Sequence, residues 1–466
     1  MQALTHQTLA AGSPAANICI GHVRYSTNGM SSICHVHPFA YPTDFTTVAP
    51  HPELLLCGNF HFAHLEQKEQ KRHAMPLHIA EIIGKAISTD QDLASALHKA
   101  LSDIDGGFAL CGLTSDGRLF AVRDSHGIRP LYYVDNEEVL ALASEPFALT
   151  AIPGIEIFNV QELAPGCVIY AKDNQTAITD NVLGRALPAF CPFEQIYFSS
   201  NKNLEIQAIR RELGRTLAQE YAHHLDENTI ITYVPNSAVD AYEGFTSLAS
   251  ALHARILEKT EDVRNFIAES DTRDLECKVA YKVADCKTLS GKSVVVIDDS
   301  IVRGTTMRQS IIPTLRQLHP SKITVLSASP QVRYPDCYGI DLSSFEELVA
   351  FRAAVSLLRQ THEGIALLQG VYNECLQCID AEIFTVNPVK QIYDKIDSSS
   401  LNARIASLLG DGTPLDVHYL SIEELHKCLR PNSGDWFFSG NYPTRGGYRF
   451  VCNAYIEFYQ GILTKQ

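Results

Sequence analysis

The sequence lacks any apolar run long enough to cross a bilayer and any run of basic residues, and it has no internal repeats or low-complexity tracts. No lysine or arginine precedes Arg24, and this first segment has no compact apolar core, so it does not resemble a signal peptide. Positive charge is scarce: 38 Lys and Arg residues stand against 53 Asp and Glu residues, for a net charge of -15. We therefore expect a soluble cytoplasmic protein that binds neither nucleic acid nor membranes.

A disulfide framework is not expected either. The 13 cysteines are spread along the whole chain, mostly in apolar contexts such as "ALCGL" and "ICIGH". An odd number of cysteines in such surroundings favours reduced, buried thiols.

The pattern of expected helices and strands changes twice along the chain. From Ile18 to about Tyr170, short β-like runs alternate with turn residues around one helical segment, "PLHIAEIIGKAI", which predicts a mostly antiparallel, sheet-rich domain. From "LEIQAIRRELGRTLAQEYAHHL" to "KITVLSASP", helical and strand-like segments alternate, which predicts right-handed crossovers and a parallel sheet. The last part is helical and polar. A chain of 466 residues is too long to fold around a single hydrophobic core. We therefore expect domains at 1–190 and 191–390 and a C-terminal helical extension at 391–466.

The stretch "VVVIDDSIVRGTT", from Val294 to Thr306, indicates a ligand site. Its apolar run predicts a strand buried in a parallel sheet, and the following loop lies at the carboxyl end, where such sheets bind ligands. Gly304 and the two threonines after it are suited to a phosphate at a helix start, while Asp298 and Asp299 are suited to sugar hydroxyls and Mg²⁺. The alternative is a solvated surface turn with capping threonines, which is disfavoured because adjacent carboxylates at a buried strand end destabilise each other.

The same stretch resembles the phosphoribosyl-pyrophosphate (PRPP) signature of glutamine PRPP amidotransferases. Further similar stretches follow in the family's order from about Ile20 to Thr444: "GHVRYST", "RDSHGIRPL", "LASEPFAL", "ELAPGCVIY", "CPFEQIYFS", "SASPQVRYPDCYGID" and "FSGNYPT". The resemblance implies an N-terminal-nucleophile (Ntn) glutaminase sandwich followed by a type I phosphoribosyltransferase sheet. Such enzymes make 5-phosphoribosylamine from PRPP and glutamine-derived ammonia, opening purine synthesis. It also implies Mg²⁺, a homo-oligomer, and purine nucleotides as inhibitors.

In the transferase half, the resemblance assigns residues one by one. Asp298 and Asp299 match the family's carboxylates for ribose and metal, and Ser237 in "YVPNSAVDAYEG" stands at a further metal or pyrophosphate ligand. The 5'-phosphate loop corresponds to Arg303, Gly304, Thr305 and Thr306. Arg264 in "VRNFIA" matches a mobile lid, with Asn265 at the usual threonine position. Ser237 as a plain turn serine and Arg264 as a surface arginine remain the alternatives.

In the glutaminase half, the resemblance is incomplete. The nucleophilic cysteine and the first strands have no counterpart, so we expect an N-terminally truncated domain. Cys57 replaces the asparagine of the oxyanion-hole "NGN", which leaves Gly58 as the second donor. No aspartate for the substrate amino group is found in "RHAMPLH", whereas Arg24 matches the arginine that grips the glutamine carboxylate, or forms a structural ion pair. We expect glutamine hydrolysis to be absent.

An iron-sulfur cluster, which some relatives carry, is not expected. Cys191 stands at the first ligand position, but Cys337 is shifted by one residue and "GDWFFSGNYPT" has no cysteine. The C-x-x-C pair, Cys375 and Cys378, lies in a helical, apolar context typical of core thiols. The histidines of "ICHVHPF", His35 and His37, would supply only two zinc ligands, and no further ligand stands nearby in the sequence. Ordinary core or surface histidines are therefore favoured.

Two functions remain open. The first is an amidophosphoribosyltransferase that uses ammonia, or glutamine if another part supplies the missing strands. The second is a non-catalytic regulator that senses PRPP or nucleotides. The intact "DDSIVRGTT" loop favours the enzyme, because a sensor could lose ligands of ribose and metal that catalysis requires.

Overall fold

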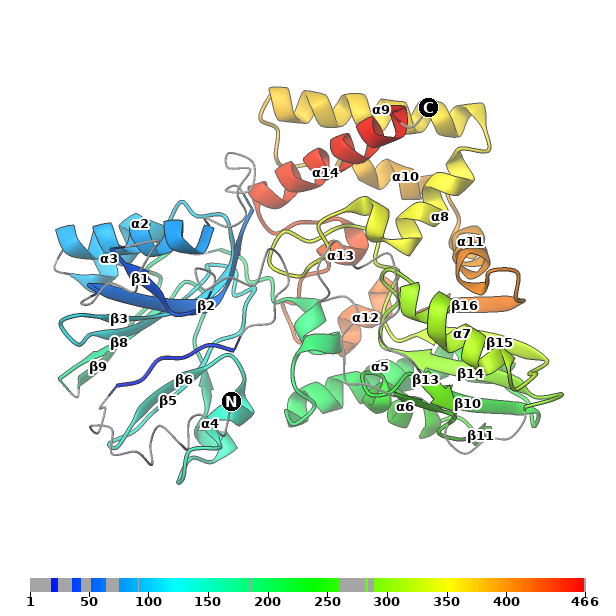
Figure 1. Cartoon of the computed structure of the whole chain (residues 1–466), viewed down its shortest axis with the longest axis horizontal. Helices are drawn as coiled ribbons and strands as arrows, with labels where there is room; N and C mark the ends of the chain where they lie inside the picture. Colours follow the sequence, from blue (N-terminus) through cyan, green and yellow to red (C-terminus); the bar gives the residue numbers. More distant parts are fainter. Residues whose placement is uncertain are drawn as a thin grey trace.

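The computed structural model describes residues 18–23, 36–42, 52–63, 75–90, 92–173, 175–184, 186–259, 281–283 and 289–464 (Figure 1). One half is built on an antiparallel sheet, the other on a parallel sheet, and the last helices pack above the parallel half in this view. The expected combination of an antiparallel sandwich, a parallel sheet and C-terminal helices is confirmed.

The first half has a six-stranded sheet in which all neighbours are antiparallel. Its strands lie in the order β1 (Phe39–Tyr41), β2 (Leu54–Phe62), β3 (Gly106–Thr114), β4 (Leu119–Arg123), β8 (Val168–Lys172) and β9 (Gln175–Thr179). Helices α2 (Met75–Thr89) and α3 (Leu93–Leu101) cover one face, against Phe108 and Leu110. A second sheet packs on the opposite face, against Ala109 and Ala121, because successive strand residues alternate between faces.

That second sheet is short. It consists of β6 (Leu140–Ala143), β5 (Tyr132–Asp135) and β7 (Gln161–Glu162), and helix α4 (Pro146–Leu149) follows β6. The sequence predicted a strand in "NICIGHVRY", but Ile18–Val23 has no regular secondary structure here.

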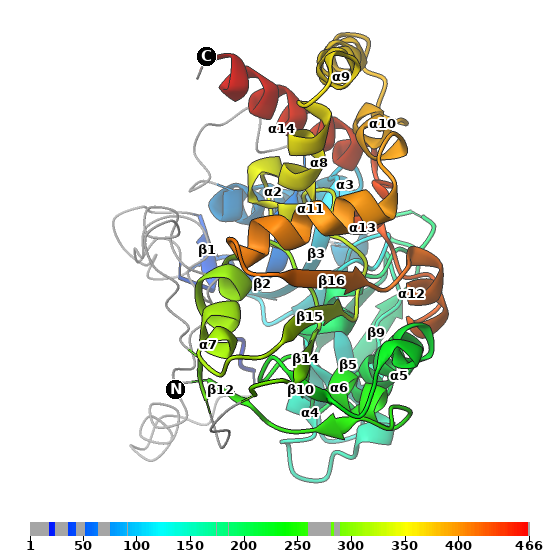
Figure 2. The same ribbon diagram turned by 90° about the vertical axis from the view of Figure 1, so that its right-hand side faces the viewer.

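The second half has a five-stranded sheet in which all neighbours are parallel. The order is β11 (Leu252–His253), β10 (Thr229–Tyr233), β14 (Ser293–Asp298), β15 (Lys322–Ser327) and β16 (Leu415–Tyr419). Helices α5 (Leu204–Tyr221) and α6 (Val239–Thr246) lie on one side, and α7 (Ile312–Arg316) and α11 (Ser398–Gly410) on the other (Figures 1 and 2). Strands β12 (Leu257–Lys259) and β13 (Tyr281–Val283) form a separate antiparallel pair.

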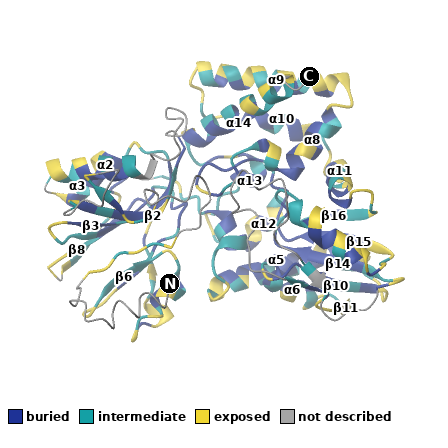
Figure 3. Ribbon diagram, viewed as in Figure 1, coloured by how far each residue is buried: buried dark blue, intermediate teal, exposed yellow. Residues whose placement is uncertain are grey.

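The C-terminal part contributes more than helices. Its segment "LDVHY" forms β16, the edge strand of the parallel sheet. The C-terminal α-helices are α10 (Gln391–Asp394), α12 (Ile422–Cys428), α13 (Trp436–Ser439) and α14 (Arg445–Thr464). They are preceded by α8 (Val349–Leu358) and α9 (His362–Asp380). Trp436 is fully buried and donates its indole N–H to Asp336 at 2.9 Å. Exposed residues gather on the outer surfaces of these helices and of the sheets (Figure 3). Within the described ranges, every helix is too short or too polar to span a membrane.

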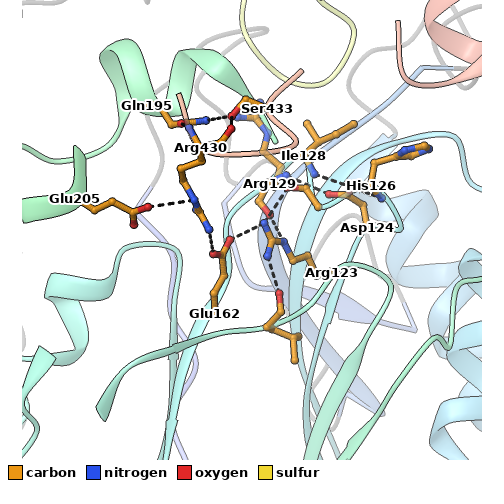
Figure 4. A network of polar contacts seen from close by, with 12 residues as sticks. Arg123, Asp124, His126, Ile128, Arg129, Glu162, Gln195, Glu205, Arg430 and Ser433 are labelled. Atoms are coloured by element: carbon orange, nitrogen blue, oxygen red, sulfur yellow. Dashed lines mark hydrogen bonds and ion pairs between the residues drawn. The ribbon is translucent and has the colours of Figure 1, made fainter. Parts of the chain in front are cut away.

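A chain of alternating charges joins the two halves (Figure 4). Arg123, which is 2% exposed, pairs with Glu162 at 2.9 Å. Glu162 also binds Arg430, whose Nε lies 3.3 Å from Glu205 on α5. Arg123 further donates to the carbonyls of Gly127, Arg129 and Leu163. The antiparallel sheet, the C-terminal segment and α5 are therefore held by one network, which runs from the buried Arg123 to the exposed Glu205.

The motif "RDSHGIRPL" forms the core of this junction. Asp124 accepts four backbone N–H groups, from Phe108, His126, Ile128 and Arg129. Arg129 then reaches across to Glu194 at 2.8 Å and to the carbonyl of Tyr338 at 3.0 Å. A buried charge that is fully hydrogen-bonded fixes geometry, whereas the same charge left unpaired is costly. The motif therefore orients the parallel half against the antiparallel half.

Arg123→Met should destabilise the protein strongly, because it leaves Glu162 with one cationic partner and three carbonyls without a donor. The expected loss is about 3–5 kcal/mol. The matched control is Arg211→Met, whose partner Glu243 is 49% exposed; that change should cost less than about 1 kcal/mol. Thermal and urea unfolding of both variants check this, and equal shifts would contradict it.

Candidate active site

The carboxyl edge of the parallel sheet brings two loops together. The run Val294–Ile297 is buried, and β14 ends at Asp298. The neighbouring strand β10 leads into the turn that carries Ser237, whose hydroxyl hydrogen-bonds Asp299. The expected strand-to-helix loop is thus present, and a helical run begins at Thr305. Asp298, Asp299 and Ser237, expected as ligands from the sequence, lie together.

The two aspartates are buried rather than solvated, with 8% and 5% exposure. Burial and the neighbouring Asp299 charge hold the pKa of Asp298 well above its ordinary range. Burial also raises the pKa of Asp299, while the hydroxyls of Ser237 and Ser300 and the charge of Arg210 oppose that rise. Two crowded carboxylates of this kind suit a ligand that brings hydroxyl donors or positive charge.

These oxygens fit Mg²⁺ that arrives with a phosphate group. Mg²⁺ in such sites uses one or two carboxylates plus substrate oxygens, not a cage made of protein alone. None of the described His, Cys, Asp and Glu residues forms a cluster of three or more able to hold a metal by itself.

The loop after β14 is tightly anchored. Gly304 has φ +75°, and a Cβ there would lie 2.3 Å from Cδ2 of the buried Leu409. The carbonyl of Val302 accepts the N–H of Val349 at 2.9 Å, and the carbonyl of Arg303 accepts Nη2 of Arg352 at 2.7 Å. Only glycine fits this backbone and this space.

Arg303 uses its guanidinium to hold the loop in place. Nη2 donates to the carbonyl of Asp341 at 2.7 Å and to Glu347 at 2.9 Å. The groups of this loop that suit a phosphate are therefore the backbone N–H groups and hydroxyls at Gly304, Thr305 and Thr306.

Arg210 is a residue of this site that the sequence reasoning missed. It is 5% exposed, lies on α5, and donates Nε to the carbonyl of Gln195 and Nη2 to that of Ser199, each at 2.9 Å. Its charge acts on Asp299 and Asp240. The sequence did carry a signal, because an arginine stands where the helical period of "IQAIRREL" requires a buried apolar residue.

Glu145, from "LASEPFAL", lies beside this arginine. It accepts the backbone N–H of Ser200 at 3.0 Å. Burial raises the pKa of its carboxyl to about 7, the Ser200 N–H opposes this, and the charge of Glu194 adds to it.

Cys57 and Gly58, which the resemblance places at an oxyanion hole, lie on β2. Cys57 is 4% exposed, burial raises the pKa of its thiol to about 11, and its Sγ lies 3.7 Å from the carbonyl of Gly21. The N–H of Gly58, the second expected oxyanion donor, points to Nδ1 of His37 at 3.4 Å. The His37 ring stacks on His22, with centroids 4.0 Å apart. Arg24, Arg264, Asn265 and His35 lie outside the described residues.

The cysteines considered for a metal lie apart from this edge. Cys191 and Cys337 are buried. Cys375 and Cys378 on α9 are also buried, and both thiols interact with Cys452 on α14. This placement agrees with thiols in a helix-helix interface.

The chain is similar to known proteins over most of its length. Residues 78–151 match a family model described as a glutamine amidotransferase domain. An amidophosphoribosyltransferase of Pyrococcus horikoshii is 30% identical over 351 residues, which is 72% of this chain and 73% of that protein. One from Methanocaldococcus jannaschii is 27% identical over 414 residues, 81% of this chain and 85% of that protein.

A solved structure shares the fold. It is described as glutamine PRPP amidotransferase from B. subtilis complexed with ADP and GMP. It aligns with a TM-score of 0.62 at 23% identity, covering 91% of this chain and 82% of that chain.

Gly304→Ala should weaken PRPP binding, because alanine disfavours φ +75° and its Cβ meets Leu409 in a packed core. We expect at least about tenfold lower affinity in calorimetric titration. Gly412→Ala is the control, since it has φ +84° but open space around a new Cβ; it shares the backbone strain without the clash. Equal affinity in both variants would show that the loop tolerates a side chain.

Glu145→Gln should alter how stability depends on pH. The raised pKa means that the folded state binds the proton more tightly than the unfolded state between the ordinary value of 4.5 and about 7, so wild-type stability falls as pH rises through this window. Glutamine keeps an oxygen for the Ser200 N–H and does not titrate. The melting temperature of Glu145→Gln minus that of the wild type should therefore increase from pH 5 to 8, on the order of a few degrees.

The control for the loss of one charge is Glu137→Gln, at an exposed turn. Its difference from the wild type should stay flat over the same range. A flat difference for Glu145→Gln as well would contradict the expected titration.

Proposed function

The chain belongs to the amidophosphoribosyltransferase family, and on that premise we propose that it forms 5-phosphoribosylamine from PRPP, the first step of purine synthesis, at the carboxyl edge of its parallel sheet. The observation that carries this proposal is the buried Asp298–Asp299 pair beside Ser237 and the glycine loop. Among the described residues, no cation is in hydrogen-bonding contact with these buried carboxylates, which suit a ligand that supplies donors and positive charge.

The site residues have distinct proposed roles. Asp298 and Asp299 accept hydrogen bonds from the ribose hydroxyls and, with Ser237, provide oxygen ligands for Mg²⁺. When bound, Mg²⁺ neutralises charge on the leaving pyrophosphate. The backbone and hydroxyls of Gly304, Thr305 and Thr306 hold the 5'-phosphate, and Arg303 keeps this loop in position through Glu347. For Arg264, which lies outside the described residues, the resemblance alone supports a role in binding the substrate.

The reaction itself is a displacement at C1 of the ribose. Ammonia forms the new C–N bond as the C–O bond to pyrophosphate breaks, and a proton is released. Positive charge develops on the sugar ring, and the carboxylates next to the ring stabilise it electrostatically.

We further propose that this chain does not hydrolyse glutamine. The oxyanion position is held by Cys57, a buried thiol and weak donor. The N–H of Gly58 is engaged with His37. Loss of one oxyanion donor typically costs a factor of ~10²–10³ in rate. Ammonia is therefore the nitrogen source, either free or from another subunit, even if Arg24 still binds a glutamine carboxylate.

The proposal also covers the domain organisation, the location, the assembly and the inhibitors of the protein. The division at about residues 190 and 390 separates a glutaminase-like domain, a transferase domain and a C-terminal extension that also supplies β16. We propose a cytoplasmic homo-oligomer without an iron-sulfur cluster. Purine nucleotides are the proposed inhibitors, in view of the ADP and GMP in the similar B. subtilis structure. The curated relatives are named as enzymes, which gives no support to a non-catalytic regulator.

The proposal has two parts, transferase activity and the absence of glutamine hydrolysis. Both are tested by measuring the pyrophosphate that the full chain releases from PRPP in the presence of Mg²⁺. Ammonium should support turnover, whereas glutamine should be at least about 100-fold less effective. The double variant Asp298→Asn, Asp299→Asn should lose activity with either nitrogen source. Rapid turnover with glutamine would overturn the second part. PRPP binding without turnover on ammonium would overturn the first and establish a regulator.

A further inference from the structure

Tyr419 is the last residue of β16 and lies in one row with the active-site carboxylates. In the register of the parallel sheet, Asp298 pairs with Ser327 and Ser327 pairs with Tyr419. Side chains of residues paired laterally across parallel strands project from the same face of the sheet. The tyrosine therefore stands two strands from Asp298, at the same edge and on the same face.

The Tyr419 hydroxyl is buried and has no hydrogen-bond partner among the described residues. Other buried tyrosines of this half do have partners: Tyr393 donates to the carbonyl of Arg333, Tyr442 to that of Pro335 and Tyr455 to that of Leu368. An unsatisfied buried hydroxyl is costly. An acceptor that turns toward the O–H when a ligand binds would satisfy it.

Asp298 is the acceptor in the same row of the sheet. It is the charged group that acts on the Tyr419 phenol, whose pKa is raised by burial and by this carboxylate. Two strand spacings amount to about 10 Å between the backbones, a gap that an aspartate and a tyrosine side chain span when extended toward each other. Ser327, which lies between them, is small and donates its hydroxyl to the carbonyl of Ser329 at 2.9 Å. It competes for neither group.

We propose that Tyr419 is a positioning residue for Asp298: when PRPP occupies the site, the phenol donates a hydrogen bond to the Asp298 carboxylate and holds it toward the ribose. In the ligand-free structure, Asp298 Oδ1 accepts the N–H of Asp299 at 3.1 Å. A donor from β16 would fix the carboxylate from a second direction. This inference rests on the proposed function, because it requires PRPP at this edge.

The test compares Tyr419→Phe with Tyr455→Phe in the full chain. PRPP with Mg²⁺ is titrated calorimetrically, and thermal unfolding is measured without ligand. Tyr419→Phe should weaken PRPP binding about tenfold, since a hydrogen bond to a charged group is lost. It should leave the ligand-free melting temperature unchanged or higher, because the unsatisfied hydroxyl is gone. In turnover, KM for PRPP should rise more than kcat falls.

Tyr455→Phe should show the opposite pattern, with a lower melting temperature and unchanged PRPP affinity, because its hydroxyl bonds Leu368 away from the site. PRPP affinity of Tyr419→Phe within twofold of the wild type would overturn the inference while leaving the proposed function intact. Equal affinity losses in both variants would also overturn it, by revealing general loosening. Absence of PRPP binding by the wild type would overturn both.

Discussion

The burial of two adjacent carboxylates at the end of β14 is the constraint around which the second half is arranged. Asp298 and Asp299 follow a strand that is buried on both faces, so neither can turn fully to solvent. The charge of Asp299 is stabilised by three groups: Ser237 from the neighbouring loop, Ser300 from the same loop, and Arg210 from α5. Each group favours ionised Asp299, yet burial keeps the pKa of both carboxyls raised. The two carboxylates thus remain crowded and buried.

Arg210 links this site to the rest of the molecule. Through the carbonyls of Gln195 and Ser199 it is tied to the segment that also carries Glu194, the partner of Arg129. From there the network continues to the antiparallel half. Because these groups are hydrogen-bonded across the junction, displacing one leaves its neighbour unpaired, so the two halves resist independent movement. A change at the junction therefore reaches the active-site carboxylates through a short series of bonded groups.

The antiparallel half keeps its architecture while the chemistry at its expected oxyanion position differs. Gly58 is required by the sheet itself, since a Cβ there would lie 2.3 Å from the carbonyl of Ala109. Its presence is consequently no sign of catalysis. Cys57 fills a buried position opposite Cys111 on β3 and makes no strong hydrogen bond.

Local pattern alone predicted the strand, loop and helix around Asp298 and Asp299 and the change from an antiparallel to a parallel half, because each depends on residues close in sequence. The phosphate-binding role of the loop stays a prediction. The tertiary structure decided what depends on distant partners. It turned Arg303 toward Glu347, placed Arg210 beside Asp299, directed Cys375 and Cys378 toward Cys452, and added β16 with Tyr419 to the sheet edge. Strand pairing across a long separation is set by packing of the whole fold, and no local periodicity encodes it.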